Sequence, residues 1–228
     1  MKFKIIAAVL FASLTSLSAF AALPTLENDR DKLSYSMGFM TGKAFKSHNI
    51  DMDPRFFSLG LDDAVRGNKA LLTEKEMQGI IQNFQKHSQA EALAKFKKMA
   101  ADNVTVGQKF LTENAKKPGV KTLPSGLQYK VLQAGTGPKP KDTDTVEVNY
   151  EGKLINGNVF DSSYKRGQPA TFAVNQVVKG WQTALVMMPV GSEWELFIPA
   201  ELAYGDADIP NIGPNQVLIF KIKLLAIK

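Results

Sequence analysis

The chain of 228 residues is long enough for one large domain or two modest ones, and its 44% hydrophobic and 22% charged residues are ordinary for a soluble globular protein. It contains no cysteine, which excludes a disulfide, a thiol nucleophile and a lipid-modified N-terminal cysteine. The formal charge of +6 falls to +4 without Lys2 and Lys4, and the remaining excess is scattered in short clusters. This pattern favours a solvated surface over a nucleic-acid partner.

The N-terminus has the pattern of a secretory signal peptide. Lys2 and Lys4 precede an apolar run over residues 5–17, and Ala19 and Ala21 supply small residues at the −3 and −1 positions. The run is too short to span a bilayer as a stable helix. We therefore predict a signal peptide at 1–21, cleaved after Ala21, and an exported mature protein in a periplasm or at the outer membrane and cell surface.

Residues 22–72 are predicted to form a helical dimerisation domain. The first helix is expected over 29–47, where Gly38 and Gly42 lie one turn apart and leave a groove for another helix backbone. Packing within one protomer and packing across a dimer are equally compatible with that groove. A second helix is expected from Pro54, a favoured first-turn residue, to the break at Gly67-Asn68.

A long connecting helix is predicted over 73–115. Thr73 and Glu76 have the spacing of a capping box, and the helical pattern runs from there to Asn114. About 40 helical residues would span roughly 60 Å. Because the second half is mostly polar, we expect an exposed arm that joins two bodies, with a bend where 103–107 have low helix propensity.

Residues 116–228 show the alternation of β-strands. Strands are expected around 146–151, 194–198 and 218–224, and a short apolar helix around 178–188. The predicted fold class is α+β: a helical N-terminal dimerisation domain, a long connecting helix, and a C-terminal antiparallel sheet wrapped on a short helix.

The C-terminal half contains few groups capable of acid–base or nucleophilic chemistry. His48 and His87 are the only histidines and both lie in the helical half, which argues against a Ser-His-Asp hydrolase and a histidine-rich metal site. Gly135-Thr136-Gly137 precedes no predicted helix and is interpreted as a loop rather than a phosphate cradle. No metal and no cofactor are expected.

Instead, the C-terminal half carries an ordered series of aromatic and apolar motifs. In chain order these are Val148-Asn149-Tyr150-Glu151-Gly152, Gly157 to Ser163, Val177-Val178-Lys179-Gly180-Trp181, Pro199 to Gly205, and Leu218-Ile219-Phe220. The series resembles the FKBP-type peptidyl-prolyl cis/trans isomerases. With its helical half and signal peptide, the chain is similar to the macrophage infectivity potentiator (Mip) and FkpA-like group, whose exported members are dimers joined through N-terminal helices.

The resemblance implies a role for each matching position. Tyr204, Asp161 and Trp181 would be catalytic: a hydroxyl offered to a substrate carbonyl, a carboxylate at the rim beside the twisting amide, and the floor on which the proline ring stacks. Val178 would present its backbone N–H to the substrate, and Ile212 would close the loop side. The remaining substrate-binding walls would be Tyr150, Phe160, Phe172, Val177 and Phe220.

Two departures from the family pattern bear on substrate preference. Ala170 stands where some members have a further aromatic residue, and the loop over 205–213 is about one residue shorter than in well-known members. Each matching residue taken alone would be interpreted as core packing, but independent core residues would not reproduce the whole ordered set.

Amide rotation is a reaction that such residues can catalyse. The barrier of about 18–20 kcal/mol comes from resonance that is lost at the half-turn. A dry apolar pocket that fits the twisted amide lowers this barrier without covalent attack. The expected activity is isomerisation of Xaa-Pro bonds in exported proteins, which assists folding and, in an infectious organism, virulence. Macrolides such as tacrolimus or rapamycin are the expected inhibitors.

Two other functions stay open on the sequence. The chain could act as a holdase chaperone, with pockets on long arms forming a cleft for non-native clients. It could also be a surface adhesin whose pocket grips proline-rich ligands.

Overall fold

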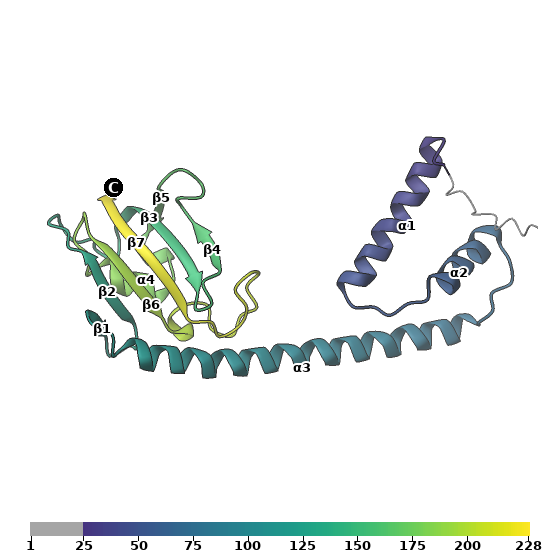
Figure 1. The fold of residues 1–228 in the computed structure, drawn as a ribbon, viewed down its shortest axis with the longest axis horizontal. Helices are drawn as coiled ribbons and strands as arrows, with labels where there is room; N and C mark the ends of the chain where they lie inside the picture. Colours follow the sequence, from purple (N-terminus) through teal and green to yellow (C-terminus); the bar gives the residue numbers. More distant parts are fainter. Residues whose placement is uncertain (1–24) are drawn as a thin grey trace, which may run out of the picture. The chain divides into compact units, whose positions relative to one another are not determined.

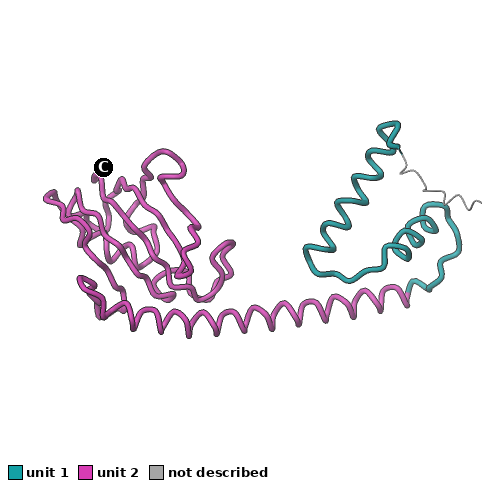
Figure 2. Tube along the Cα trace, viewed as in Figure 1, with its two compact units in different colours: residues 1–74 teal, residues 75–228 magenta. Residues whose placement is uncertain are grey.

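A computed structural model describes residues 25–228, so the predicted signal peptide at 1–21 lies outside the described residues. The chain forms two compact units, residues 1–74 and residues 75–228 (Figure 2). The element order is helical first and then mostly β-strand (Figure 1). This agrees with the predicted α+β class.

The first unit contains two capped helices. In α1 (Asp29–Ser47) the N-cap Asn28 accepts a hydrogen bond from the Asp31 amide, and in α2 (Pro54–Arg66) Asp53 caps the Arg55 amide. Gly67 ends α2 with φ 71°, the left-handed conformation that glycine adopts at low cost. Within the described residues of this unit, neither helix has a buried residue.

Helix α3 (Glu74–Asn114) runs without interruption for 41 residues, and all of it after Glu74 belongs to the second unit. Residues 103–107, where a bend was expected, are helical throughout. The expectation of an exposed arm is wrong for the C-terminal part of the helix. Gly107 and Asn114 are buried there. The polar and small residues of this part pack against the domain that follows, because they form hydrogen bonds and close backbone contacts with it.

The second unit is built on an antiparallel sheet. Its main strand order is β1-β2-β6-β7-β3-β4, with β5 paired to β3. The strands are β1 (Val120–Thr122), β2 (Gln128–Gln133), β3 (Thr145–Leu154), β4 (Val159–Ser162), β5 (Ala170–Ala173), β6 (Glu193–Ile198) and β7 (Leu218–Ile227). Short helices η1 (Val174–Gln176), α4 (Lys179–Leu185) and η2 (Ala200–Leu202) complete the unit.

The core lies between one face of the sheet and α4. Strand β3 alternates strictly between buried and partly exposed residues, so Val146, Val148 and Tyr150 share the inner face. Trp181, Ala184 and Leu185 are the buried apolar side chains of α4. The site described below lies at one end of this core. Within residues 25–228, no helix combines the length and the apolarity needed to cross a bilayer.

Candidate functional site

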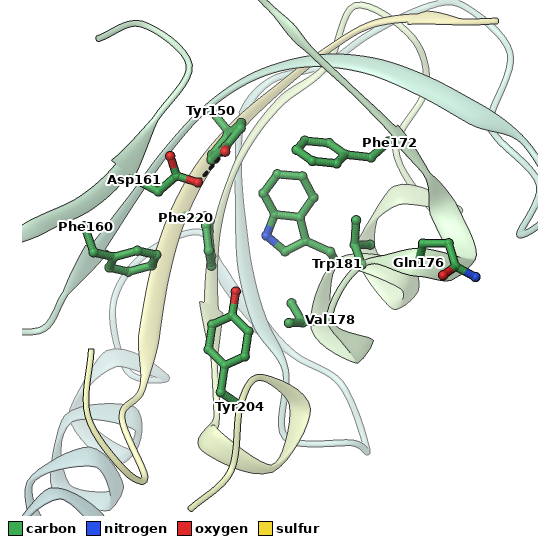
Figure 3. A pocket seen from close by; sticks show the side chains of 10 residues that line it. Tyr150, Phe160, Asp161, Phe172, Gln176, Val178, Trp181, Tyr204 and Phe220 are labelled. Atoms are coloured by element: carbon green, nitrogen blue, oxygen red, sulfur yellow. Dashed lines mark hydrogen bonds between the residues drawn. The ribbon is translucent and has the colours of Figure 1, made fainter. Parts of the chain in front are cut away.

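An aromatic cleft of about 260 Å³ opens to solvent between the sheet and α4. Figure 3 shows the side chains from separate segments converging on it. The lining residues are Tyr150, Phe160, Asp161, Phe172, Gln176, Val177, Val178, Trp181, Tyr204 and Phe220. This volume is close to the lower end of the range of small-molecule sites, roughly 300 Å³.

The floor of the cleft is the indole of Trp181, which is 4% exposed. The rings of Tyr150 and Phe220 each lie 5.2 Å from it and nearly perpendicular to it, and Phe172 lies 5.8 Å away in the same edge-to-face manner. Such edge-to-face contacts are the preferred arrangement of aromatic rings and restrain each ring's orientation. The indole nitrogen of Trp181 is buried and has no hydrogen-bond partner within residues 25–228.

Two glycines allow this close arrangement. A Cβ at Gly152 would lie 2.6 Å from the Phe220 ring and 2.8 Å from the Phe160 ring, so both rings occupy the space above this strand position. A Cβ at Gly180 would lie 2.4 Å from Ile198. The absence of side chains at these positions therefore lets the Phe160 and Phe220 rings approach β3 and lets α4 approach β6.

The start of α4 presents a backbone donor. Val178 is the N-cap of α4, and its carbonyl accepts from the Trp181 and Gln182 amides. The Gln182 side chain donates to the Val177 carbonyl at 2.7 Å, which fixes the preceding peptide. Within residues 25–228 the Val178 N–H itself donates to no acceptor, so it is available to a ligand.

A three-residue network closes the opposite wall. The Tyr150 hydroxyl donates to one Asp161 oxygen, and Arg166 forms an ion pair with the other. Arg166 also donates to the Tyr150 hydroxyl at 2.8 Å and lies over its ring, 5.4 Å from the centroid. Burial would raise the pKa of Asp161, but the hydrogen bonds from Tyr150 and Arg166 and the guanidinium charge outweigh it and hold that pKa below its ordinary value.

Tyr204 approaches from the segment after η2, and its hydroxyl points into the cleft (Figure 3). Desolvation and, secondarily, the charge of Asp161 raise the pKa of Tyr204. The hydroxyl is therefore protonated at neutral pH and can donate a hydrogen bond. Among the described residues it has no hydrogen-bond partner, which leaves this donor free.

The cleft brings together nearly all of the residues expected from the sequence. The exception is Ile212, which packs against the hydrophobic core and is not among the lining residues. The sequence reasoning missed Gln176 on the rim and Arg166 in the network. The only signal for Arg166 was a cation five residues after Asp161, and no local pattern indicates that this loop folds back.

Neither a metal centre nor a nucleophile–base pair is suggested by the site. Residues 25–228 contain no group of three or more histidine, cysteine, aspartate or glutamate side chains that could hold a metal ion. The one carboxylate in the cleft already accepts from two donors. The arrangement can enclose an apolar group, offer it two hydrogen-bond donors, and exclude water.

Comparisons with known proteins match both parts of the chain. Residues 137–225 match the family described as FKBP-type peptidyl-prolyl cis-trans isomerase, and residues 30–131 match the domain amino terminal to it. Peptidyl-prolyl cis-trans isomerase Mip of Coxiella burnetii is 54% identical over 92% of each chain. Outer membrane protein MIP of Legionella longbeachae is 47% identical over 100% of this chain and 99% of its own.

A solved structure is similar over both units. The crystal structure of FkpA from Escherichia coli aligns with a TM-score of 0.70 at 39% identity, covering 90% of this chain and 99% of that one.

Proposed function

This chain belongs to the FKBP-type peptidyl-prolyl cis-trans isomerases, and on that premise we propose that the cleft around Trp181 is where it rotates Xaa-Pro bonds. The chain acts on these bonds as a peptidyl-prolyl isomerase, without a covalent intermediate. We assign the reaction to this cleft because of its chemistry. Aromatic side chains line nearly every side, and the one carboxylate is already paired.

Shape and desolvation supply most of the effect. The proline ring would stack on Trp181 between Tyr150 and Phe220, in a space that excludes water. The planar amide carries more charge separation than the twisted one, so an apolar surface disfavours the planar ground state relative to the transition state. Asp161 is unsuited to act as a base because its pKa is depressed and both oxygens accept hydrogen bonds.

Two donors orient the substrate. The free N–H of Val178 would bind the carbonyl after the proline, and the Tyr204 hydroxyl would bind a further substrate carbonyl. Both groups lie on the cleft wall. Held at two points, the peptide adopts a turned conformation about the proline, which reduces the entropy lost at the transition state.

The test is the cis/trans relaxation of an Xaa-Pro tetrapeptide, followed in a protease-coupled assay. We expect Tyr204→Phe to lower kcat/KM about three- to tenfold, as for one lost hydrogen bond. Tyr164→Phe is the matched control, since this phenol is 51% exposed and lies outside the cleft. Equal rates with and without the wild-type protein would refute an isomerase, and equal effects of the two variants would refute this site.

We further propose that the substrates are exported polypeptides and that macrolides such as tacrolimus or rapamycin compete for the same cleft. An exported location is supported by the N-terminal pattern and by the name of the Legionella longbeachae relative, an outer membrane protein. Mass spectrometry of the exported protein should give an N-terminus at Ala22. A retained Met1 would contradict export by cleavage.

The proposed assembly is a homodimer through the N-terminal helices. In α1, a Cβ at Gly38 or Gly42 would meet no atom of residues 25–228 within 4 Å, so the glycine groove is empty in the single chain. Large apolar side chains of α1 and α2 are exposed, among them Leu33, Met37, Met40, Phe56 and Leu61. A second copy of the chain would bury these surfaces.

A further inference from the structure

The segment that follows Tyr204 is a closed loop at the cleft. Its neck is sealed by a hydrogen bond from the Asn215 amide to the Gly205 carbonyl at 2.7 Å. Inside the loop, the Ile212 and Gly213 amides both donate to the Ile209 carbonyl. Because Gly205 directly follows Tyr204, the position of the Tyr204 ring depends on how this neck is held.

Helix α3 contacts this neck from outside the cleft. The Asn103 side-chain amide donates to the Pro214 carbonyl at 2.7 Å, and the Asn215 side chain donates to the Ala100 carbonyl at 3.5 Å. One turn earlier, Met99 lies 3.8 Å from the position that a Cβ would take at Gly213. Three consecutive loop residues, 213–215, are thus in contact with one face of α3.

The same helix is fixed to the domain further along its length. The Gly107 backbone approaches Val217 so closely that a Cβ would lie 2.8 Å from its methyl group. The Phe110 and Phe197 rings are 6.0 Å apart, and buried Asn114 donates to Gln128, which in turn donates to the Leu111 carbonyl. With these contacts α3 can act as a rigid support for the loop.

We propose that Asn103 is a positioning residue for the isomerase reaction: through Pro214 and the Asn215–Gly205 bond it holds Tyr204 in the cleft. This inference rests on the proposed site. It gives the C-terminal part of α3 a second role beside joining the two units, because part of the substrate-binding wall is then oriented from outside the cleft.

The substitution that isolates this contact is Asn103→Asp. It keeps the size of the side chain and replaces the amide donor with an acceptor that repels the Pro214 carbonyl. Asn83→Asp is the matched control on the same helix, since Asn83 is exposed and its side chain makes no hydrogen bond within the described residues. Asn103→Ala serves as a second variant that removes the donor without adding charge.

The first readout is amide hydrogen exchange in the intact protein. We expect exchange at Asn215 to accelerate about three- to tenfold in Asn103→Asp and Asn103→Ala, the change that corresponds to one hydrogen bond. Exchange should be unchanged in Asn83→Asp. Unchanged exchange at Asn215 in both Asn103 variants would overturn the anchoring, whatever the protein's activity.

The second readout links the anchor to catalysis. We expect Asn103→Asp to raise KM for an Xaa-Pro peptide about three- to tenfold with kcat within about twofold, because the lost interaction orients bound peptide. In a Tyr204→Phe background the same change should have little further effect on KM. Additive effects of the two substitutions would overturn the proposal, since they would show that Asn103 acts independently of Tyr204.

The two proposals fail in different ways. A wild-type protein without activity but with accelerated exchange at Asn215 in the Asn103 variants would refute the proposed function alone. An active wild type whose exchange and KM are insensitive to Asn103 would refute the anchor alone.

Discussion

Arg166 and Tyr150 together determine how the Asp161 carboxyl behaves. They donate to different oxygens of the carboxylate, and both raise the cost of protonating it. The carboxylate therefore stays ionised at neutral pH, and both of its oxygens accept hydrogen bonds. This pairing restrains the Tyr150 hydroxyl and leaves the carboxylate poorly suited to exchange protons with a substrate.

We predict that Arg166→Gln raises the pKa of Asp161 toward its ordinary value. The folded-state pKa of Asp161 is depressed, so its contribution to stability is present above the unfolded pKa and is lost as pH falls through the folded value, below about pH 4. The wild type should lose this contribution to stability on acidification. In Arg166→Gln the contribution is smaller, so acidification should lower the stability of this variant by less. A carbon-13 NMR titration of the Asp161 carboxyl measures the shift directly.

Arg66→Gln is the control for this titration, because Arg66 pairs with Asp62 on α2, an exposed helix of the first unit. An Asp161 titration midpoint that is the same in Arg166→Gln and in the wild type would contradict the assigned network.

Gly152 is a second residue whose role depends on neighbours distant in sequence. We predict that Gly152→Ala displaces the Phe160 and Phe220 rings, because its Cβ would lie within 3 Å of both. Overpacking of this kind costs about 1–3 kcal/mol of stability, and KM for an Xaa-Pro peptide should rise as the wall moves. Urea denaturation and peptide kinetics measure the two effects.

The adjacent Lys153→Ala, on the opposite face of β3, should change neither stability nor KM appreciably. If Gly152→Ala left both stability and KM unchanged, as expected for Lys153→Ala, the prediction that the Phe160 and Phe220 rings are tightly packed over Gly152 would be wrong.

At the scale of elements, α3 differs from its sequence-based prediction. Its two ends have different surroundings. A Cβ placed at Gly79 would have no described atom within 4 Å, whereas a Cβ at Gly107 would lie 2.8 Å from a methyl group of Val217. A glycine inside a helix is destabilising unless the missing side chain serves a contact. Gly107 serves one, since it lets the helix backbone approach the sheet domain.

We therefore predict opposite results for the same substitution at two positions of α3. Gly79→Ala should stabilise the helix by about 0.5–1 kcal/mol. Gly107→Ala should gain as much in helix propensity but lose more by overpacking against Val217, by about 1–3 kcal/mol. Thermal unfolding of the two variants decides this. A Gly107→Ala variant as stable as Gly79→Ala would show that the docking of α3 is loose.

The sheet was predicted from the sequence more reliably than the docking of α3. Strand β3 and parts of β6 and β7 alternate between apolar and polar residues, and alternation is a local signal that requires no knowledge of the partner strand. The docking face of α3 includes the apolar Met99 and Phe110, but most of its contacts come from Ala100, Asn103, Gly107 and Asn114, which have no apolar periodicity. These residues act through hydrogen bonds and close backbone approach, so their role becomes visible only beside their partners.

The same distinction applies to the cleft. Motifs such as 160–163, 177–181 and 199–205 could be identified because each is contiguous and matches a family pattern. Arg166 could not be assigned to the site, because its partner Tyr150 lies 16 residues away and is reached by a loop. Ile212 was expected to close the loop side of the cleft by analogy; it packs against the same core as Phe160 and Val178 but is not among the residues that line the cleft.

At the scale of the whole molecule, two compact units make separate contributions. The second unit contains the cleft and its support, while the first presents unpartnered apolar helices. An exposed apolar face of this extent is unusual for a monomer. Dimerisation would bury it and would hold two clefts in one assembly, which is also the arrangement that the holdase alternative requires.

We predict a dimer for the mature protein at micromolar concentration, and monomers for the double variant Gly38→Leu, Gly42→Leu, because leucine side chains would fill the groove that another helix must enter. Light scattering with mass determination is the measurement. Peptide isomerisation by the double variant should match the wild type, since the cleft lies wholly within the second unit. A monomeric wild type would contradict the proposed assembly.

The sequence by itself determined the division into a helical half and a strand half, the family, and the residues of the aromatic motifs, because each of these depends on local periodicity or contiguous pattern. Only the tertiary structure decided which side chains share the cleft, that Arg166 forms an ion pair with Asp161, and that α3 contacts the neck of the Tyr204 loop. Those relations depend on distances between segments far apart in the chain, and such distances are fixed by packing rather than by any one segment.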